Sequence, residues 1–520
     1  MRHRVLAAGL LLLASQVMGQ DKVLRVVPHS NLNILDPIWT TQFMARNHGY
    51  MVYDTLFGTD EKNRVQPQMV ERWSVSADQK LWTFTLRDGL EFHDGKPVGG
   101  EDVTASLERW GKRDAMGQKL MSFVERMDSP DARTFRIFLR EPCGIMLEAL
   151  GKPSSNVPFV MPRRVAQTPA DKQIEESIGS GPYIFVKEEF KPGDRAVYIK
   201  NKKYVPRSEA ASGTAGGKHV YVDRVEWNLA LRDAQAQVNA LAKGEVDVLE
   251  RPAFESYEQL KQVPDIAIIT KDPLGFQYMA RFNHLHPPFN NPKVRQAALA
   301  AMQQEPFLRA QVGIKEFYKP CPSMFTCGTP YGSAKGSEVQ SKSSVRKAQE
   351  LLKASGYDGT PVVILKPTDL AAIQKLPDVA ALLLRQAGFK VDLQAMDWNT
   401  VVSRRSKKEP PAQGGWNIFL TAWLAPDVWN PLTNAAIGAA GEKSWFGWPS
   451  DAELEKLRDQ FARETDDGTK KALAEQIQAR AFEIGTHAPL GEYVNPIATR
   501  KNVTGWVIGS GDVYWNVKKN

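Results

Sequence analysis

Residues 80–110 read KLWTFTLRDGLEFHDGKPVGGEDVTASLERW, and this stretch decides the fold. Trp82, Phe84 and Leu86 alternate with polar residues, which is the two-residue period of a strand with one buried face. The dipeptides Asp88-Gly89 and Asp94-Gly95 follow, and Asp-Gly favours tight turns. The sequence therefore predicts a strand that ends in turns.

A helix is expected directly after these turns. Gly99-Gly100 interrupts the chain, and Val103, Leu107 and Trp110 then share one face at helical spacing. The unit shows no catalytic triad, no phosphate-binding loop and no set of metal ligands. An ordinary strand–turn–helix unit would have the same pattern. Only the exact string of residues can therefore indicate a particular family.

The string resembles the signature of the family 5 extracellular solute-binding proteins, the peptide- and nickel-type receptors of ABC importers. The resemblance rests on the order strand, Asp-Gly turn, FHDG and ED-V-x-x-S-L-x-R. Other matches to the same family are Leu35-Asp36-Pro37, GSGPY at 179–183, GEVDV at 244–248 and the segment 282–298. A phosphate cradle at 179–183 is disfavoured, because neither a Lys-Ser/Thr pair nor a helix follows it. The matches are good over residues 35–305 and looser over 310–450.

The first twenty residues, MRHRVLAAGLLLLASQVMGQ, indicate export. Arg2 and Arg4 precede an apolar run at 5–14, and small residues at Val17 and Gly19 predict cleavage after Gly19. No cysteine follows the cut, so we expect no lipid anchor. Together with the resemblance, this leader predicts a periplasmic location.

Size and charge limit the class of protein. A chain of 520 residues is too long for one core and predicts two or more domains. The formal net charge is +8, but Lys and Arg are scattered rather than gathered in a stripe. We therefore expect a mildly basic soluble surface and no nucleic-acid partner.

The resemblance implies an α/β fold, namely the two-lobed periplasmic-binding-protein fold of type II in its large variant, with an extra subdomain and a hinge between the lobes. Helical patterns at 345–352 and 370–387 alternate with strand patterns at 362–365 and 391–395, which supports parallel α/β pairing. The implied division is a signal peptide at 1–19, lobe I at 20–47, 178–275 and 486–520, an inserted subdomain at 48–177, and lobe II at 276–485.

Three cysteines are present. Cys321 and Cys327 lie in the turn-rich segment PCPSMFTCG of an exported chain, which predicts a local disulfide. Cys143 would then be a lone thiol. We interpret it as a small buried residue, because no His or Asn lies near it in sequence to activate it.

Tryptophan is concentrated in one region: six of the 13 fall between residues 398 and 448. Clustered indole rings suit the walls of a ligand cleft, although burial in a core is the alternative for each of them. The predicted ligand-binding residues are Trp398, Arg404, Arg405, Trp423, Asp427, Trp429 and Trp445, with Trp39 and Trp110 facing them from the other lobe.

The resemblance implies roles for some of these residues. In the peptide-binding branch, a Trp placed like Trp398 lines the pocket, and the Asp of a W-x-A-D-Y string pairs with the peptide's α-amino group. The corresponding string here is WLAPD, which ends at Asp427, one residue later than the pattern, so a turn cap is the alternative role. A basic side chain near Arg404 and Arg405 can hold a ligand carboxylate, with solvated surface charge as the alternative.

The sequence thus predicts a non-enzymatic periplasmic substrate-binding component of an ABC transporter. It is expected to act as a monomer without a cofactor, to capture a short peptide or peptide-like amino compound, and to deliver it to an inner-membrane ABC permease. A metal or metal-chelate receptor on the same fold is one alternative, but His284 and His286 are the only close His pair and lack further ligands nearby. A secreted hydrolase is the other, and no nucleophile, base and oxyanion hole can be assembled for it.

Overall fold

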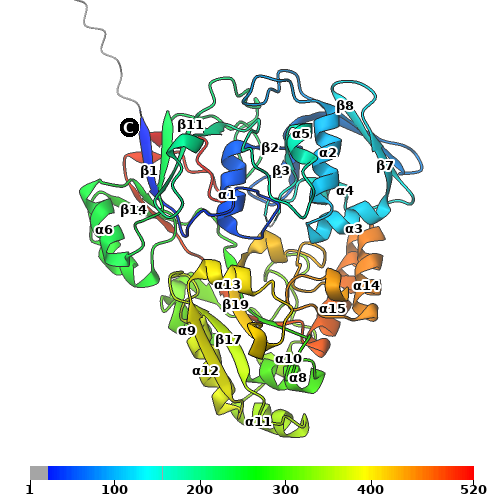
Figure 1. The fold of residues 1–520 in the computed structure, drawn as a ribbon, viewed down its shortest axis with the longest axis vertical. Helices are drawn as coiled ribbons and strands as arrows, with labels where there is room; N and C mark the ends of the chain where they lie inside the picture. The colour runs from blue at the N-terminus through cyan, green and yellow to red at the C-terminus, as the bar shows by residue number, and fades with distance from the viewer. Residues whose placement is uncertain (1–21, 155) are drawn as a thin grey trace, which may run out of the picture.

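The computed structural model describes residues 22–154 and 156–520 (Figure 1). The predicted signal peptide at 1–19 lies outside the described residues. Figure 1 shows two lobes, one above the other, each with its own β-sheet. Within the described ranges, no helix combines the length and the apolar character that crossing a bilayer requires.

The first lobe is organised around a seven-stranded sheet with the order β10-β11-β12-β1-β13-β21-β14. Its strands are β1 (Val23–Val27), β10 (Tyr183–Phe185), β11 (Arg195–Lys200), β12 (Arg224–Asn228), β13 (Val248–Leu249), β14 (Ile266–Ile269) and β21 (Ile497–Arg500). The central strand β1 pairs in parallel with β12 and β13, and its Leu24 and Val26 are fully buried. Helix α6 (Ala234–Lys243) links β12 to β13, α7 (Tyr257–Lys261) precedes β14, and β22 (Val503–Thr504) pairs with β23 (Lys518–Lys519).

The inserted subdomain follows α1 (Phe43–Val52) and contains an antiparallel sheet with the order β5-β6-β8-β7. Its elements are β2 (Asp54–Thr55), β3 (Phe57–Thr59), β4 (Val65–Pro67), β5 (Val70–Val75), β6 (Leu81–Leu86), α2 (Gly100–Trp110), α3 (Ala115–Phe123), β7 (Val124–Asp128), β8 (Thr134–Leu139), α4 (Met146–Leu150), β9 (Phe159–Val160) and α5 (Arg163–Ala166). The predicted strand and helix are confirmed as β6 and α2. Phe84 of β6 stacks on Phe135 of β8, with 4.8 Å between the ring centroids.

The second lobe carries a six-stranded sheet with the order β16-β20-β15-β19-β17-β18. Its strands are β15 (Phe276–Phe282), β16 (Tyr318–Lys319), β17 (Val362–Pro367), β18 (Val391–Met396), β19 (Ile418–Leu424) and β20 (His487–Tyr493). Its helices are α8 (Pro292–Ala301), α9 (Gln304–Gln311), α10 (Glu338–Ser341), α11 (Val345–Ala354), α12 (Leu376–Gln386), α13 (Trp398–Arg404), α14 (Ala452–Arg463) and α15 (Asp467–Ile484). The alternation predicted from residue 345 is present, and β17 is parallel to β18 and β19. Helix α12 starts later than predicted, because Pro377 fits only the first turn of a helix.

The chain passes between the two sheets twice, once between β14 and β15 and once between β20 and β21. Strand β20 pairs with β15 in the second sheet, so the return to the first lobe lies at residues 494–496 and not at 486. With that change, the predicted division into two lobes and an inserted subdomain stays our proposal for the domain boundaries.

Two of the strings that carried the family resemblance meet in a buried ion pair. Asp36 of the Leu-Asp-Pro string accepts from Arg109 of α2, with 2.7 Å from Nη2 to Oδ2 and 3.2 Å from Nη1 to Oδ1. Their side chains are 0% and 3% exposed. Because Asp36 belongs to the first lobe, the pair ties α2 of the subdomain to that lobe. Arg109 also donates to the carbonyls of Thr168 and Lys172 within the subdomain.

Two other strings also touch each other. His93 of FHDG donates its backbone N–H to the Gly179 carbonyl (2.8 Å), and its Nε2 lies 3.1 Å from the Gly181 carbonyl oxygen. The two glycines of GSGPY in turn lie against the end of α1, where the Gly181 N–H donates to the Val52 carbonyl (2.9 Å). A Cβ at Gly179 would lie 2.1 Å from that oxygen, so glycine is needed for the close approach of the two backbones.

We expect Gly179→Ala to lower the free energy of unfolding by about 1–3 kcal/mol, because the methyl group must push the α1 backbone away. Urea unfolding of the purified mature chain measures the change. Gly468→Ala is the matched control, since a Cβ there meets only the Asp466 carboxylate oxygen, at 3.3 Å, and alanine favours helix. Equal stability of the two variants would contradict this account of Gly179.

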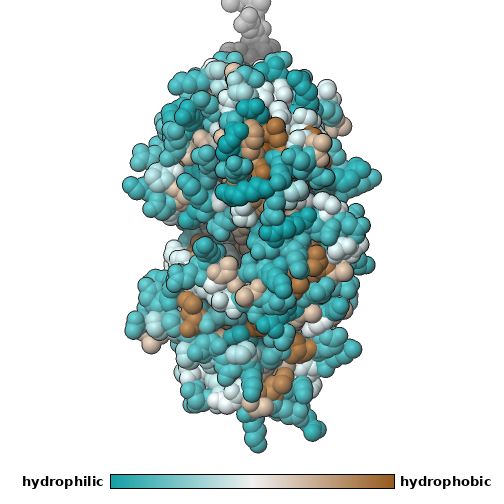
Figure 2. Space-filling model, turned by 90° about the vertical axis from the view of Figure 1, so that its right-hand side faces the viewer, coloured by the Kyte–Doolittle hydropathy of each residue, from teal (hydrophilic) through white to brown (hydrophobic). Residues whose placement is uncertain are grey.

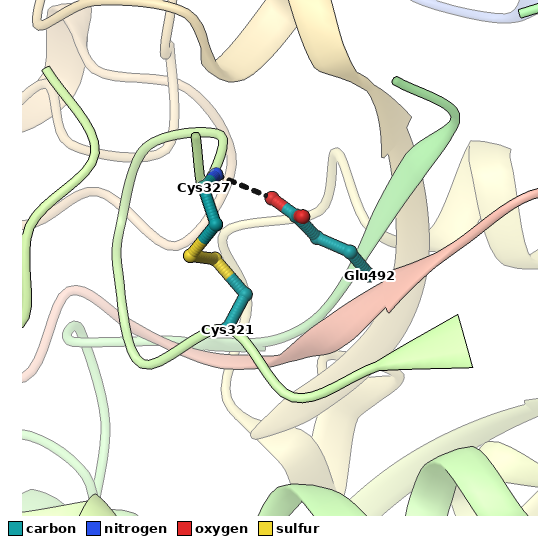
Figure 3. Close-up of side chains that lie close together, drawn as sticks. All are labelled: Cys321, Cys327 and Glu492. Atoms are coloured by element: carbon teal, nitrogen blue, oxygen red, sulfur yellow. Dashed lines mark hydrogen bonds between the residues drawn. A yellow bond between two sulfur atoms is a disulfide. The ribbon is translucent and has the colours of Figure 1, made fainter. Parts of the chain in front are cut away.

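The predicted disulfide joins Cys321 and Cys327, whose Cα atoms lie 5.9 Å apart (Figure 3). The Cys327 N–H donates to the carboxylate of Glu492 on β20 (2.7 Å), as Figure 3 shows. Inside the bridged loop, Met324 and Phe325 are fully buried. Cys143 is buried as interpreted, and burial raises the pKa of its thiol to about 11, which keeps it protonated and unreactive at neutral pH.

Candidate ligand-binding cleft

The described residues of both lobes together line at least four cavities. The widest, of about 640 Å³, shares Lys443 and Trp445 with one of the other three, which are smaller. These three are named here the aromatic pocket (about 50 Å³), the central cavity (about 210 Å³) and the outer cavity (about 240 Å³). Thr41 lines both the aromatic pocket and the central cavity, while Lys152 and Thr433 line both the central and the outer cavity. The cavities are therefore neighbours in a row, and Figure 2 shows the surface hollowed at mid-height between the two halves.

The aromatic pocket is walled by Trp398 and Trp423 from the second lobe and by Phe43 from the first. Trp423 lies near the end of β19, where its ring meets that of Trp445 edge to face at 4.8 Å. Trp398 is the first residue of α13; its N–H donates to Asp369 Oδ1 (2.7 Å). Two predicted site residues therefore share one cavity.

Arg405 also lines the aromatic pocket, directly after the end of α13. Its Nη2 donates to Thr41 Oγ1 of the first lobe (3.2 Å), so this side chain bridges the cleft. The neighbouring Arg404 is placed elsewhere. Its guanidinium donates to the carbonyls of Gly414 and Gly415, at 2.9 and 2.8 Å, and it lines none of the three cavities.

The central and outer cavities take in three more predicted residues. Trp39 from the first lobe and Trp445 from the second line the central cavity, and the guanidinium of Arg113 lies 4.5 Å from the Trp39 ring centre. Trp429 lines the outer cavity beside Asn430. Indole rings from both lobes thus face this row of cavities, whereas Trp416 and Trp448 of the tryptophan-rich region pack in the core of the second lobe.

Asp427 lies in a short 3-10 helix, Ala425–Val428, that continues from β19. It is fully buried, and Ser154 of the first lobe donates from Oγ to its Oδ2 at 3.0 Å. Pro426 and Pro153, the preceding neighbours of these two residues, both line the outer cavity. The carboxylate therefore lies directly behind the cavity wall and joins the two lobes.

Trp110 does not reach the cleft in this structure. It is 1% exposed and packs in the core of the subdomain, where its Nε1 donates to the Asn156 carbonyl. The face that Trp110 shares with Val103 and Leu107 is buried in that core. We therefore leave Trp110 out of the proposed site.

A buried charge network lies behind the aromatic pocket, and sequence reasoning missed it. His29 Nδ1 lies 2.5 Å from Glu250 Oε2, and Arg251 donates to Asp512 at 2.8 Å. Burial is the main cause that lowers the pKa of His29. His29, Glu250 and Asp512 are spaced closely enough to hold a cation, but Arg251 and Lys271 already neutralise Asp512. These residues come from distant parts of the chain, so no local pattern could reveal them.

The His pair considered for a metal is used differently. His284 Nε2 lies 3.0 Å from the Gly485 carbonyl oxygen, and His286 Nε2 lies 2.7 Å from that of Lys408. In the described part of the chain, the groups spaced for a metal include neither of these two.

Comparisons with known proteins identify the family of the chain. A model of the bacterial extracellular solute-binding proteins, family 5, matches residues 64–444. A probable peptide ABC transporter periplasmic-binding protein of Sinorhizobium fredii is 38% identical over 512 residues, which cover 98% of this chain and 96% of that protein. A glutathione-binding protein of Pectobacterium atrosepticum is 25% identical and covers 82% of this chain and 79% of its own.

Solved structures match along nearly the whole chain. A periplasmic binding protein from A. tumefaciens R10, in complex with agropinic acid, superposes with a TM-score of 0.81 at 21% identity and covers 96% of this chain and 99% of its own. A dipeptide-binding protein from Pseudoalteromonas, in complex with Met-Leu, gives 0.79 at 18% identity, with coverage of 96% and 100%. These matches confirm the predicted fold class.

Proposed function

Because the chain belongs to family 5 of the bacterial extracellular solute-binding proteins, we propose that it captures a short peptide or peptide-like amino compound and delivers it to an ABC permease of the inner membrane. The observation that carries the proposal is the row of three cavities between the lobes, with indole rings on both sides. Flat apolar walls combined with a few polar groups suit small amino compounds. The peptide-type relative of S. fredii supports the ligand class.

The proposal extends to the working state of the protein. We expect a periplasmic monomer without catalytic activity, in which ligand binding favours the arrangement of lobes that the permease recognises. Hydrogen bonds that already cross the cleft, such as Thr41 to Arg405 and Ser154 to Asp427, would hold that arrangement together.

Individual roles follow from position. Trp398, Trp423, Trp445, Trp39 and Trp429 would form the walls that contact the ligand. Asp427 would accept the ligand's amino group, since its turn forms part of the outer cavity wall. An amino group placed there would compete with Ser154 for the same carboxylate.

Isothermal titration calorimetry with dipeptides and tripeptides, and with their N-acetylated forms, tests the proposal. Native mass spectrometry of protein purified from the periplasm would show which compound is carried over. We expect free peptides to bind and N-acetylation to weaken binding, because acetylation removes the charged amino group. If neither free nor acetylated peptides bind, the proposed ligand class is wrong.

We expect Trp423→Ala to raise the Kd of a bound peptide at least about 30-fold, the usual effect of deleting a central aromatic anchor. The ring is 3% exposed and lies between the aromatic pocket and Trp445. Trp73→Ala is the matched control, because Trp73 is 39% exposed on β5 of the subdomain. A Kd that rises equally in both variants would remove Trp423 from the site.

A further inference from the structure

Arg405 is a buried cation for which the described residues supply no anion. It is 3% exposed and forms no ion pair within this part of the chain. Among the described residues, Thr41 is the one that accepts a hydrogen bond from the Arg405 guanidinium, and the guanidinium Nε has no partner there. Burial lowers the pKa of Arg405 to about 10, so the guanidinium remains charged at neutral pH.

Aromatic rings surround this charge without satisfying its N–H groups. The guanidinium carbon lies 5.1 Å from the ring centre of Phe446, and 5.7–5.8 Å from those of Phe419, Trp398 and Trp445. A buried charge without a counter-ion is unfavourable. A carboxylate in the pocket would accept two parallel N–H groups from the guanidinium and remove this cost.

The aromatic pocket is shaped and charged for such a group. Its lining contains no Asp or Glu among the described residues, and its other arginine, Arg251, is already paired with Asp512. At about 50 Å³, the pocket has room for a carboxylate and little more. The remainder of the ligand would therefore lie in the adjoining central cavity, past Thr41.

The central cavity has a cationic excess of its own. Arg113 from the first lobe and Lys443 from the second both line it, and neither has an ion pair in the described ranges. The acidic residue on this wall, Asp114, is occupied by a buried ion pair with Lys152. A second anionic group placed there would meet positive charge from both lobes.

We infer that the ligand is an acidic amino compound with two carboxylates, one bound by Arg405 in the aromatic pocket and the other placed between Arg113 and Lys443. This inference rests on the proposed function and narrows it from amino compounds in general to acidic ones. In a peptide, the two carboxylates would be that of the C-terminus and that of an acidic side chain. The structure does not assign which of the two binds to Arg405 and which lies between Arg113 and Lys443.

Titration calorimetry with Ala-Glu, Ala-Gln and the C-terminal amide of Ala-Glu tests the inference. Each replacement of a carboxylate by an amide is expected to weaken binding about 10- to 100-fold, because a charge-assisted hydrogen bond becomes a neutral one. Comparing Ala-Glu with Ala-Gln tests the side-chain carboxylate, and comparing Ala-Glu with its C-terminal amide tests the C-terminal carboxylate.

Variants then assign the groups to their sites. Arg405→Met is expected to abolish the preference for the carboxylate that Arg405 binds and to keep the preference for the other. Arg405→Lys should keep part of the first preference and all of the second. Arg404→Met should keep both preferences, as should Arg346→Met, which removes a charge from an 89% exposed side chain on α11. Loss of a preference in Arg404→Met instead of Arg405→Met would overturn the assignment.

A parallel panel of N-acetylglutamate, glutarate and their amides separates this inference from the proposed function. If N-acetylglutamate or glutarate binds while no peptide binds, the proposal of a peptide ligand is wrong and the proposal of an acidic ligand is supported. Equal binding of acids and amides in both panels would overturn the acidic ligand and leave a receptor for neutral peptides. An absence of binding in both panels would overturn both proposals.

Discussion

Replacing Asp36 by alanine is expected to lower the free energy of unfolding by about 3–5 kcal/mol, the range found when one partner of a buried ion pair is removed. The substitution would leave the Arg109 guanidinium, 3% exposed, without its carboxylate. It would also leave the backbone N–H groups of Ile38 and Ile174 without the side-chain oxygens that they donate to. Urea unfolding followed by far-UV circular dichroism measures the change.

Asp128→Ala is the matched control for this prediction. Asp128 lies on the edge strand β7, where it pairs with Arg126 of the same strand and Arg136 of β8, and its side chain is 31% exposed. Surface pairs of this kind contribute up to about 1 kcal/mol. The double variant Asp36→Asn/Arg109→Gln should regain part of the loss, because no uncompensated charge stays buried. A loss below about 1 kcal/mol in Asp36→Ala would contradict the role given to the pair.

Replacing Arg281 by methionine is expected to lower the free energy of unfolding by about 2–4 kcal/mol and to weaken ligand binding as well, because four carbonyls, two of them fully buried, lose the hydrogen bonds that Arg281 donates. Arg281 lies on β15 and is fully buried. Its guanidinium donates to the carbonyls of Ala436, Trp445, Phe446 and Thr486. It therefore fixes the segment that carries Trp445 and Phe446 into the central cavity.

Unfolding and titration calorimetry on the same protein measure both effects. Burial lowers the pKa of Arg281 to about 9, so the charge is present at neutral pH, and Arg281→Lys keeps it while offering fewer donors. We expect the lysine variant to lie between wild type and Arg281→Met in both measurements. If Arg281→Met were destabilised but bound ligand with an unchanged Kd, Arg281 would be a structural residue and would not position the cleft.

The elements that the sequence predicted well are those with local signals. Helix α2 follows the predicted spacing of Val103, Leu107 and Trp110, all three of which are buried. Strand β6 follows its alternation, and the Cys321–Cys327 bridge follows from short spacing in an exported chain. Each of these features depends on residues only a few positions apart. They could therefore be predicted without knowledge of the tertiary packing.

The site was predicted only in part, for a physical reason. Spacing shows which residues share a face, but not what that face will meet, and so Trp110 became core while Trp398 became a wall of the cleft. Arg404 and Arg405 are adjacent, yet successive positions on a helix point about 100° apart. One guanidinium consequently reaches the Gly414 carbonyl and the other the aromatic pocket.

We expect the disulfide between Cys321 and Cys327 to make the ligand-binding competence of the protein dependent on oxidising conditions during its production. Thr326, inside the loop, donates its N–H to the Val428 carbonyl and its hydroxyl to that of Ala425, and so it supports the turn that carries Asp427. We therefore expect oxidation of Cys321 and Cys327 to affect the geometry of the proposed binding site as well as the stability of the fold. Material expressed in a reducing cytoplasm should titrate with a lower active fraction than secreted material, and oxidative refolding should restore it.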